Sequence, residues 1–162
     1  MNPAKYTCIG LCALFCTAGQ AWAELDSAIS LHQGFDLRVK ASLSRTVAPT
    51  PLPIVFIGPG KAKATPQGVT LKFDVLTPNG QRGKAVIRWR NPLEYHPDRP
   101  HFAGRGVARV RLPHANFRFR LGVKGTIIRC DDGELLIHGR FSSAACSVDG
   151  AKLVGKFVGK EH

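Results

Sequence analysis

The chain has 162 residues, a formal net charge of +12 and a hydrophobic fraction of 44%. This length is enough for one hydrophobic core and too short for two ordinary domains. The excess of basic residues favours anionic partners, which outside the cytoplasm are lipid headgroups, lipopolysaccharide, acidic glycans or an acidic envelope protein. Nucleic acid is the less expected partner of an exported protein.

Residues 1–23 are expected to be a cleaved secretory signal peptide. Lys5 is followed by an uncharged apolar run over 6–18, and Ala21 and Ala23 are the small residues that signal peptidase reads. The run is shorter than the ~20 residues that span a bilayer. Removing 23 of the 162 residues leaves one domain over 24–162, with 22 Lys and Arg against 11 Asp and Glu. We therefore expect a periplasmic or extracellular protein, with peripheral membrane contact as one option.

Two cysteines, Cys130 and Cys146, remain after the signal peptide, which holds the other three of the five. An isolated pair in an oxidising compartment predicts one disulfide, worth about 3 kcal/mol in the chain-entropy description. A metal or redox pair is the weaker alternative, because the sequence lacks C-x-x-C spacing and a second ligand pair.

Alternating apolar and polar residues predict an all-β fold. The pattern is clearest over 36–44, 69–75 and 117–124, where every second residue is apolar. Such segments bury one face and leave the other in water.

Turn residues indicate how these strands are joined. Two-residue hairpin loops favour Asn-Gly or Asp-Gly, because they need positive φ angles. The expected turns are Asn79-Gly80, Asp132-Gly133 and Asp149-Gly150, with a fourth hairpin through 113–115. The prediction is an antiparallel β-sandwich or a partly closed β-barrel of about eight or nine short strands, with one disulfide.

Three segments depart from this pattern. Residues 46–53 are expected to be a proline-rich connector within the domain. A short helix is expected over 25–32, and the proline-rich stretch 91–104 is expected to be the longest loop.

The strongest functional signal is arginine on the predicted water-facing positions. Like charges opposite one another destabilise a sheet, and a bound polyanion would remove that cost. Arginine also suits bidentate contact with phosphate or carboxylate. A solvated, solubilising face is the alternative. The predicted anion-binding residues are Arg88, Arg90, Arg109, Arg111, Arg118 and Arg120.

Two weaker clusters carry less weight. His96 and His101 lie near Glu94 and Asp98 in a proline-bounded segment, which makes them the best metal candidates, although a polar surface loop without a tightly bound metal is the expectation. The acidic run 131–134 is explained by its hairpin turn.

Enzyme signatures are absent from the sequence. No Gly-x-Ser-x-Gly elbow, His-Glu-x-x-His motif, Walker loop or dinucleotide fingerprint occurs, and no cofactor is expected. The first hypothesis is a non-enzymatic exported module whose arginine face binds an anionic envelope component. The alternatives are a structural or scaffolding subunit of an envelope secretion or transport assembly and a metal-binding periplasmic protein.

Overall fold

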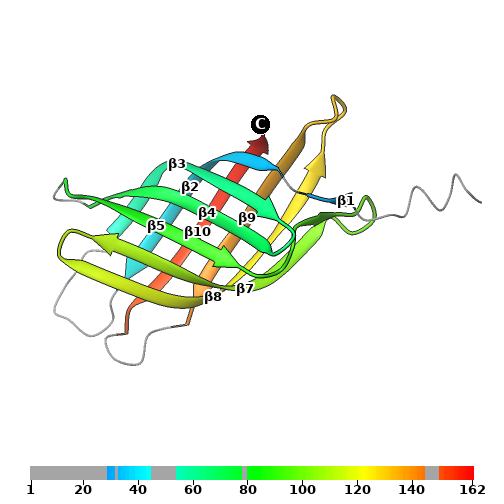
Figure 1. The fold of residues 1–162 in the computed structure, drawn as a ribbon. Coiled ribbons are helices and arrows are strands. Elements are labelled where there is room, and N and C mark those ends of the chain that lie inside the picture. Colours follow the sequence, from blue (N-terminus) through cyan, green and yellow to red (C-terminus); the bar gives the residue numbers. More distant parts are fainter. Residues whose placement is uncertain (1–28, 32, 45–53, 78–79, 145–149) are drawn as a thin grey trace, which may run out of the picture.

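The computed structural model describes residues 29–31, 33–44, 54–77, 80–144 and 150–162, and it is built from ten strands with no helix in these ranges. Eight of the strands form one closed barrel, and two short ones form a separate sheet (Figure 1). The barrel strands are β2 (Gly34–Ser44), β3 (Ile54–Thr65), β4 (Gly68–Leu76), β5 (Arg82–Trp89), β7 (His101–Leu112), β8 (Ala115–Arg129), β9 (Leu135–Ser143) and β10 (Lys152–Glu161). The short sheet pairs β1 (Ile29–Ser30) with β6 (Glu94–Tyr95).

The barrel has up-and-down topology. Each strand pairs antiparallel with the next barrel strand along the chain, and β10 returns to pair with β2 from Lys152↔Ser44 to Glu161↔Phe35. Closure satisfies both edges, which a sandwich would leave exposed. Of the two predicted architectures, the structure is therefore the barrel, and it is closed rather than partly closed.

Glycines with positive φ mark four of the hairpins. Gly80 (φ 81°), Gly133 (φ 88°) and Gly150 (φ 63°) lie at the three predicted turns, although Asn79 and Asp149 are outside the described residues. Gly68 (φ 133°) begins β4 after the β3–β4 turn, which the sequence analysis missed. The predicted hairpin through 113–115 joins β7 to β8.

The structure differs from the sequence predictions in several segments, and one predicted segment lies outside the described residues. The strand β3 was not among the predicted strands; in the structure Gly60 faces inward, where a Cβ would lie 2.9 Å from Val39. The expected helix over 25–32 is wrong where it is described, since Ile29–Ser30 is a strand. The stretch 91–104 contains β6 and the start of β7, and the connector 46–53 lies outside the described residues.

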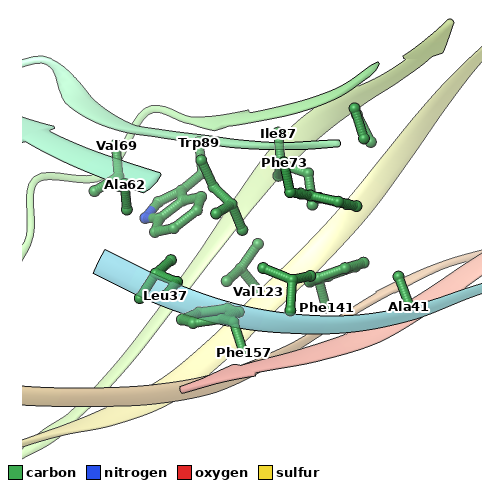
Figure 2. Packing of buried hydrophobic residues seen from close by; sticks show 14 of the residues in the cluster. Leu37, Ala41, Ala62, Val69, Phe73, Ile87, Trp89, Val123, Phe141 and Phe157 are labelled. Atoms are coloured by element: carbon green, nitrogen blue, oxygen red, sulfur yellow. The ribbon is translucent and has the colours of Figure 1, made fainter. Parts of the chain in front are cut away.

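The barrel interior is filled by a column of aromatic rings. Neighbouring rings lie 6.4–6.5 Å apart between centroids, in the order Phe73, Phe141, Phe157, Trp89, Phe102. Figure 2 shows four of these rings packed among smaller apolar side chains from opposite walls. The rings and their apolar neighbours thus pack the interior with side chains, as is typical of an eight-stranded barrel.

Each ring of the column lies opposite a glycine on a neighbouring strand. The cross-strand pairs are Phe73↔Gly60, Trp89↔Gly106, Phe102↔Gly125, Phe141↔Gly155 and Phe157↔Gly139. At Gly139 a Cβ would lie 2.5 Å from Cζ of Phe157. The absent side chain makes room for the ring, which in turn covers the bare backbone.

Candidate anion-binding site

The outer wall over β5, β7 and β8 carries the predicted arginines. Strand parity places Arg88, Arg109 and Arg118 on the outside, because their chain neighbours Trp89, Val110 and Phe119 are buried. In the ladder between β7 and β8, Arg109 is directly opposite Arg118. The local alternation of each strand therefore determines which way these side chains point.

These arginines line one hollow of about 1160 Å³, which we call the basic hollow. All six predicted residues take part: Arg88, Arg90, Arg109, Arg111, Arg118 and Arg120. Three further cations lie in its lining: Arg105, which alternation places on the same face as Arg109 and Arg111, and Lys72 and Lys84, which were not predicted. Lys72 and Lys84 reach the hollow because β4 pairs with β5. Alternation within one strand does not predict the register of that pairing.

The arginines of the basic hollow have no carboxylate beside them in its described lining, whereas Lys84 lies directly opposite Asp74 of β4. Among the residues that the structure describes, the lining of the basic hollow contains no Asp or Glu. The described part of the chain has the ion pairs His96–Glu94, Lys160–Glu134 and His162–Asp36. None of them includes an arginine of the hollow. Arg109 and Arg118 thus face each other without a counter-charge, at a cost of roughly 0.2–1 kcal/mol.

Basic residues also cover the rest of the outer wall, but they are of a different kind. Lys124, Arg140, Lys156 and Lys40 follow one another across β8, β9, β10 and β2 in directly opposed positions. Lysine prevails on β3, β4 and β10, arginine prevails on β5, β7 and β8, and β2 carries one of each, Arg38 and Lys40. A smaller hollow of about 320 Å³ over β2, β9 and β10 holds Arg38, Lys40 and Lys156 and also has no Asp or Glu in its described lining, so the basic hollow differs from it in size and in the number of arginines.

The two candidate metal ligands have separate partners. His96 Nε2 lies 3.7 Å from Glu94 Oε2 beside β6. His101, at the start of β7, places Nδ1 2.9 Å from Thr126 Oγ1 on β8. Within the described ranges, no three His, Cys, Asp or Glu side chains form a group that could hold a metal ion.

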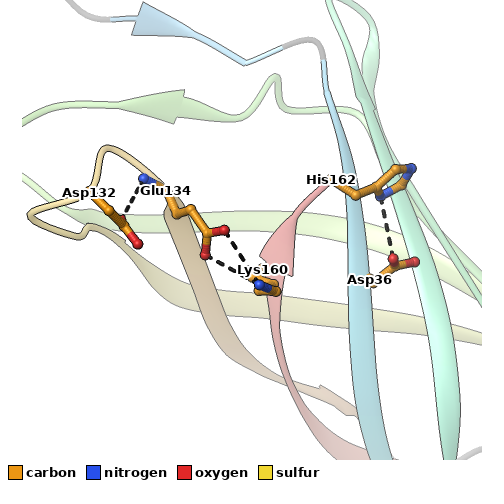
Figure 3. Close-up of polar contacts among 5 residues, drawn as sticks. All are labelled: Asp36, Asp132, Glu134, Lys160 and His162. Atoms are coloured by element: carbon orange, nitrogen blue, oxygen red, sulfur yellow. Dashed lines mark hydrogen bonds and ion pairs between the residues drawn. The ribbon is translucent and has the colours of Figure 1, made fainter.

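The acidic turn between β8 and β9 is occupied by structural contacts (Figure 3). The backbone N–H of Glu134 donates to Asp132 Oδ1 at 3.0 Å, and Lys160 Nζ lies 3.4 Å from Glu134 Oε1. Nearby, His162 Nδ1 lies 3.8 Å from Asp36 Oδ2. The two contacts of Glu134 close the turn and connect it to β10, in agreement with the interpretation of 131–134 as a hairpin.

The predicted disulfide is not present in the described chain. Cys130 is half-buried and free, and Cys146 lies outside the described residues. Because Cys146 is not among the described residues, the Cys130–Cys146 bond stays a prediction.

The expected signal peptide, residues 1–23, also lies outside the described residues. In the part of the chain that the structure covers, no helix has the length and apolarity to cross a membrane.

Comparison with known proteins gives little guidance. No protein-family model matches the sequence, and no curated protein is similar to it. Among solved structures, the ywiB protein from Bacillus subtilis is 11% identical and aligns over 78% of this chain and 92% of its own, with a TM-score of 0.32.

Proposed function

We propose that this protein is an exported, non-enzymatic binding module that holds an anionic envelope component in the basic hollow. The observation that supports the proposal is the gathering of seven arginines, six on β5, β7 and β8 and Arg90 directly after β5, in one hollow whose described lining has no carboxylate. Ligands of the right class are lipid headgroups, lipopolysaccharide and acidic glycans.

Binding would work through many weak contacts. Each guanidinium offers a planar fork of donors that fits phosphate, sulfate or carboxylate oxygens. An exposed single contact contributes little because water and salt screen it. Several arginines on a fixed sheet act together, because the barrel has already positioned their backbones. Affinity should consequently be steeply dependent on salt.

The first test removes four of the charges. In a variant with Arg109, Arg111, Arg118 and Arg120 replaced by Gln, binding to anionic vesicles, lipopolysaccharide or an acidic glycan should fall at least about tenfold and lose most of its salt dependence. The fold should be retained, because all four side chains are exposed. Co-sedimentation and fluorescence titration at several salt concentrations measure the effect, and circular dichroism checks the fold.

A matched control separates a site from general charge. Arg38, Lys40, Lys152 and Lys156 are exposed on β2 and β10, which lie opposite β5 and β7 in the barrel order. Replacing these four by Gln changes the net charge equally and should leave binding nearly unchanged. Equal losses in both variants would contradict a site in the hollow. No binding by the parent to any of the three anions would instead favour an acidic protein as the partner and a scaffolding role.

A further inference from the structure

The register across four strands arranges the floor of the basic hollow as a diagonal. On the outer wall, Val86 of β5 is opposite Arg109, and Val107 of β7 is opposite Arg88. Gly122 of β8 is opposite Arg105. Val86, Val107 and Gly122 are therefore successive diagonal neighbours, each one strand and two residues from the last. We call this uncharged diagonal the neutral lane.

Cations flank the neutral lane on both sides. The same register places successive cations of β4, β5, β7 and β8 along one flank and successive cations of β5, β7 and β8 along the other. The first flank is Lys72, Arg88 and Arg105, continued just beyond the hollow by Lys124, and the second is Lys84, Arg109 and Arg120. Diagonal neighbours in a sheet are about 7–8 Å apart, so each flank repeats a positive charge at that interval.

From this arrangement we infer that the basic hollow binds a linear acidic glycan, laid along Val86, Val107 and Gly122 with its charged groups directed to both flanks. The inference rests on the proposed function and specifies its ligand. A chain is favoured over a compact anion because the cations lie in diagonal lines, two beside the neutral lane and a third, Arg111 and Arg118, beyond Arg109 and Arg120. Ser142, opposite Gly122, and Thr70, opposite Arg88, add hydroxyl groups that suit sugar hydroxyls.

Two other polyanions fit the hollow less well. Proteins that bind single-stranded nucleic acid present exposed aromatic rings for base stacking, whereas the aromatic ring in this lining, Trp89, is 3% exposed and belongs to the interior column. A bilayer surface would contact the long flanking side chains and leave the low floor of Val86, Val107 and Gly122 unused. A single extended chain fills the floor and reaches both flanks.

Gly122 offers a way to block the neutral lane without disturbing the barrel. A Cβ at this position would meet no atom within 4 Å, and the residue is exposed in β8. Glycine inside a strand weakens it unless something approaches the backbone closely. Here the described chain places nothing against Gly122, which leaves room for a ligand.

The test uses the full mature protein, size-fractionated heparin oligosaccharides as the linear acidic glycan, and Gly122→Leu as the obstruction. Parent affinity should rise with oligosaccharide length until the chain covers roughly 20–25 Å, the span of the three diagonal steps from Lys72 to Lys124, and then level off. Gly122→Leu should reduce affinity at least about tenfold without lowering the melting temperature. Gly122→Ala should have a smaller effect on affinity. Ser44→Leu, an exposed change on β2 of the opposite wall, should have none.

The outcomes distinguish the ligand inference from the proposed function. If the fourfold arginine variant loses heparin binding while Gly122→Leu keeps it, the neutral lane is wrong and the anion-binding function stands. If the parent binds anionic vesicles but no oligosaccharide, the glycan is wrong. If a single-stranded oligonucleotide of equal charge binds as tightly and is blocked by Gly122→Leu, the lane accepts nucleic acid and the glycan assignment is again overturned.

Discussion

Glycine has two opposite uses in this barrel, and single residues show the contrast. Gly139 and Gly125 face inward, where Phe157 and Phe102 occupy the volume that a side chain would need. Gly122 faces outward beside open space. The sequence does not distinguish these two uses. Alternation predicts which face of the sheet a glycine occupies, but it does not predict which aromatic ring of another strand covers that glycine.

Gly139→Ala should destabilise the barrel. Its Cβ would lie 2.5 Å from Cζ of Phe157 and 2.9 Å from the backbone oxygen of Lys124, and that oxygen cannot move without disturbing the β8–β9 ladder. Overpacking of this kind costs about 1–3 kcal/mol. Gly122→Ala is the matched control and should change the free energy of unfolding by less than about 0.5 kcal/mol. Urea unfolding measures both, and equal stability of the two variants would contradict the close contact at Gly139.

At the scale of strands, alternation predicted the faces of β7 and β8 well. Val110 separates Arg109 from Arg111, and Phe119 separates Arg118 from Arg120, so that parity follows from local sequence. The participation of Lys72 and Lys84 was missed, because it depends on the β4–β5 register. The strand β3 was missed for a different reason: its Gly58-Pro59-Gly60 has poor strand propensity, and the neighbouring strands override it.

The direct opposition of Arg109 and Arg118 provides a test of the β7–β8 register. Replacing Arg118 by Glu turns a repulsive cross-strand pair into an attractive one and should raise stability by about 0.5–1 kcal/mol. Anion binding should weaken severalfold in the same variant. Arg118→Gln, which removes the repulsion without adding attraction, should give an intermediate gain. Denaturant midpoints at an unchanged m-value report the gain; a loss of stability in the Glu variant would mean that the two side chains do not face each other.

Closure of the barrel is a property of the whole molecule that local patterns do not contain. The pairing of β10 with β2 joins segments from opposite ends of the described chain. The sequence of neither segment predicts that it pairs with the other. Closure also determines the charge of the surface, because every polar strand face must then point outward. Among the described barrel strands, the carboxylates on that outer wall are Asp36 and Asp74, against many Lys and Arg.

Such an unbalanced wall should make stability depend on salt in two separable ways. Self-repulsion of a basic surface is screened as ionic strength increases, so raising NaCl from about 20 mM to about 300 mM should raise the melting temperature of the parent. Sulfate at matched ionic strength should raise it further, partly by general exclusion from the protein surface and partly by binding in the basic hollow, because a ligand of the folded state stabilises it.

Two variants separate these two effects of sulfate. The fourfold variant at Arg109, Arg111, Arg118 and Arg120 should keep the stabilisation by general exclusion and lose the stabilisation by binding in the hollow. The β2 and β10 control variant keeps both. Differential scanning calorimetry of the three proteins in both salts gives the comparison. An equal additional shift with sulfate in all three would show that the hollow holds no anion in preference to the rest of the wall.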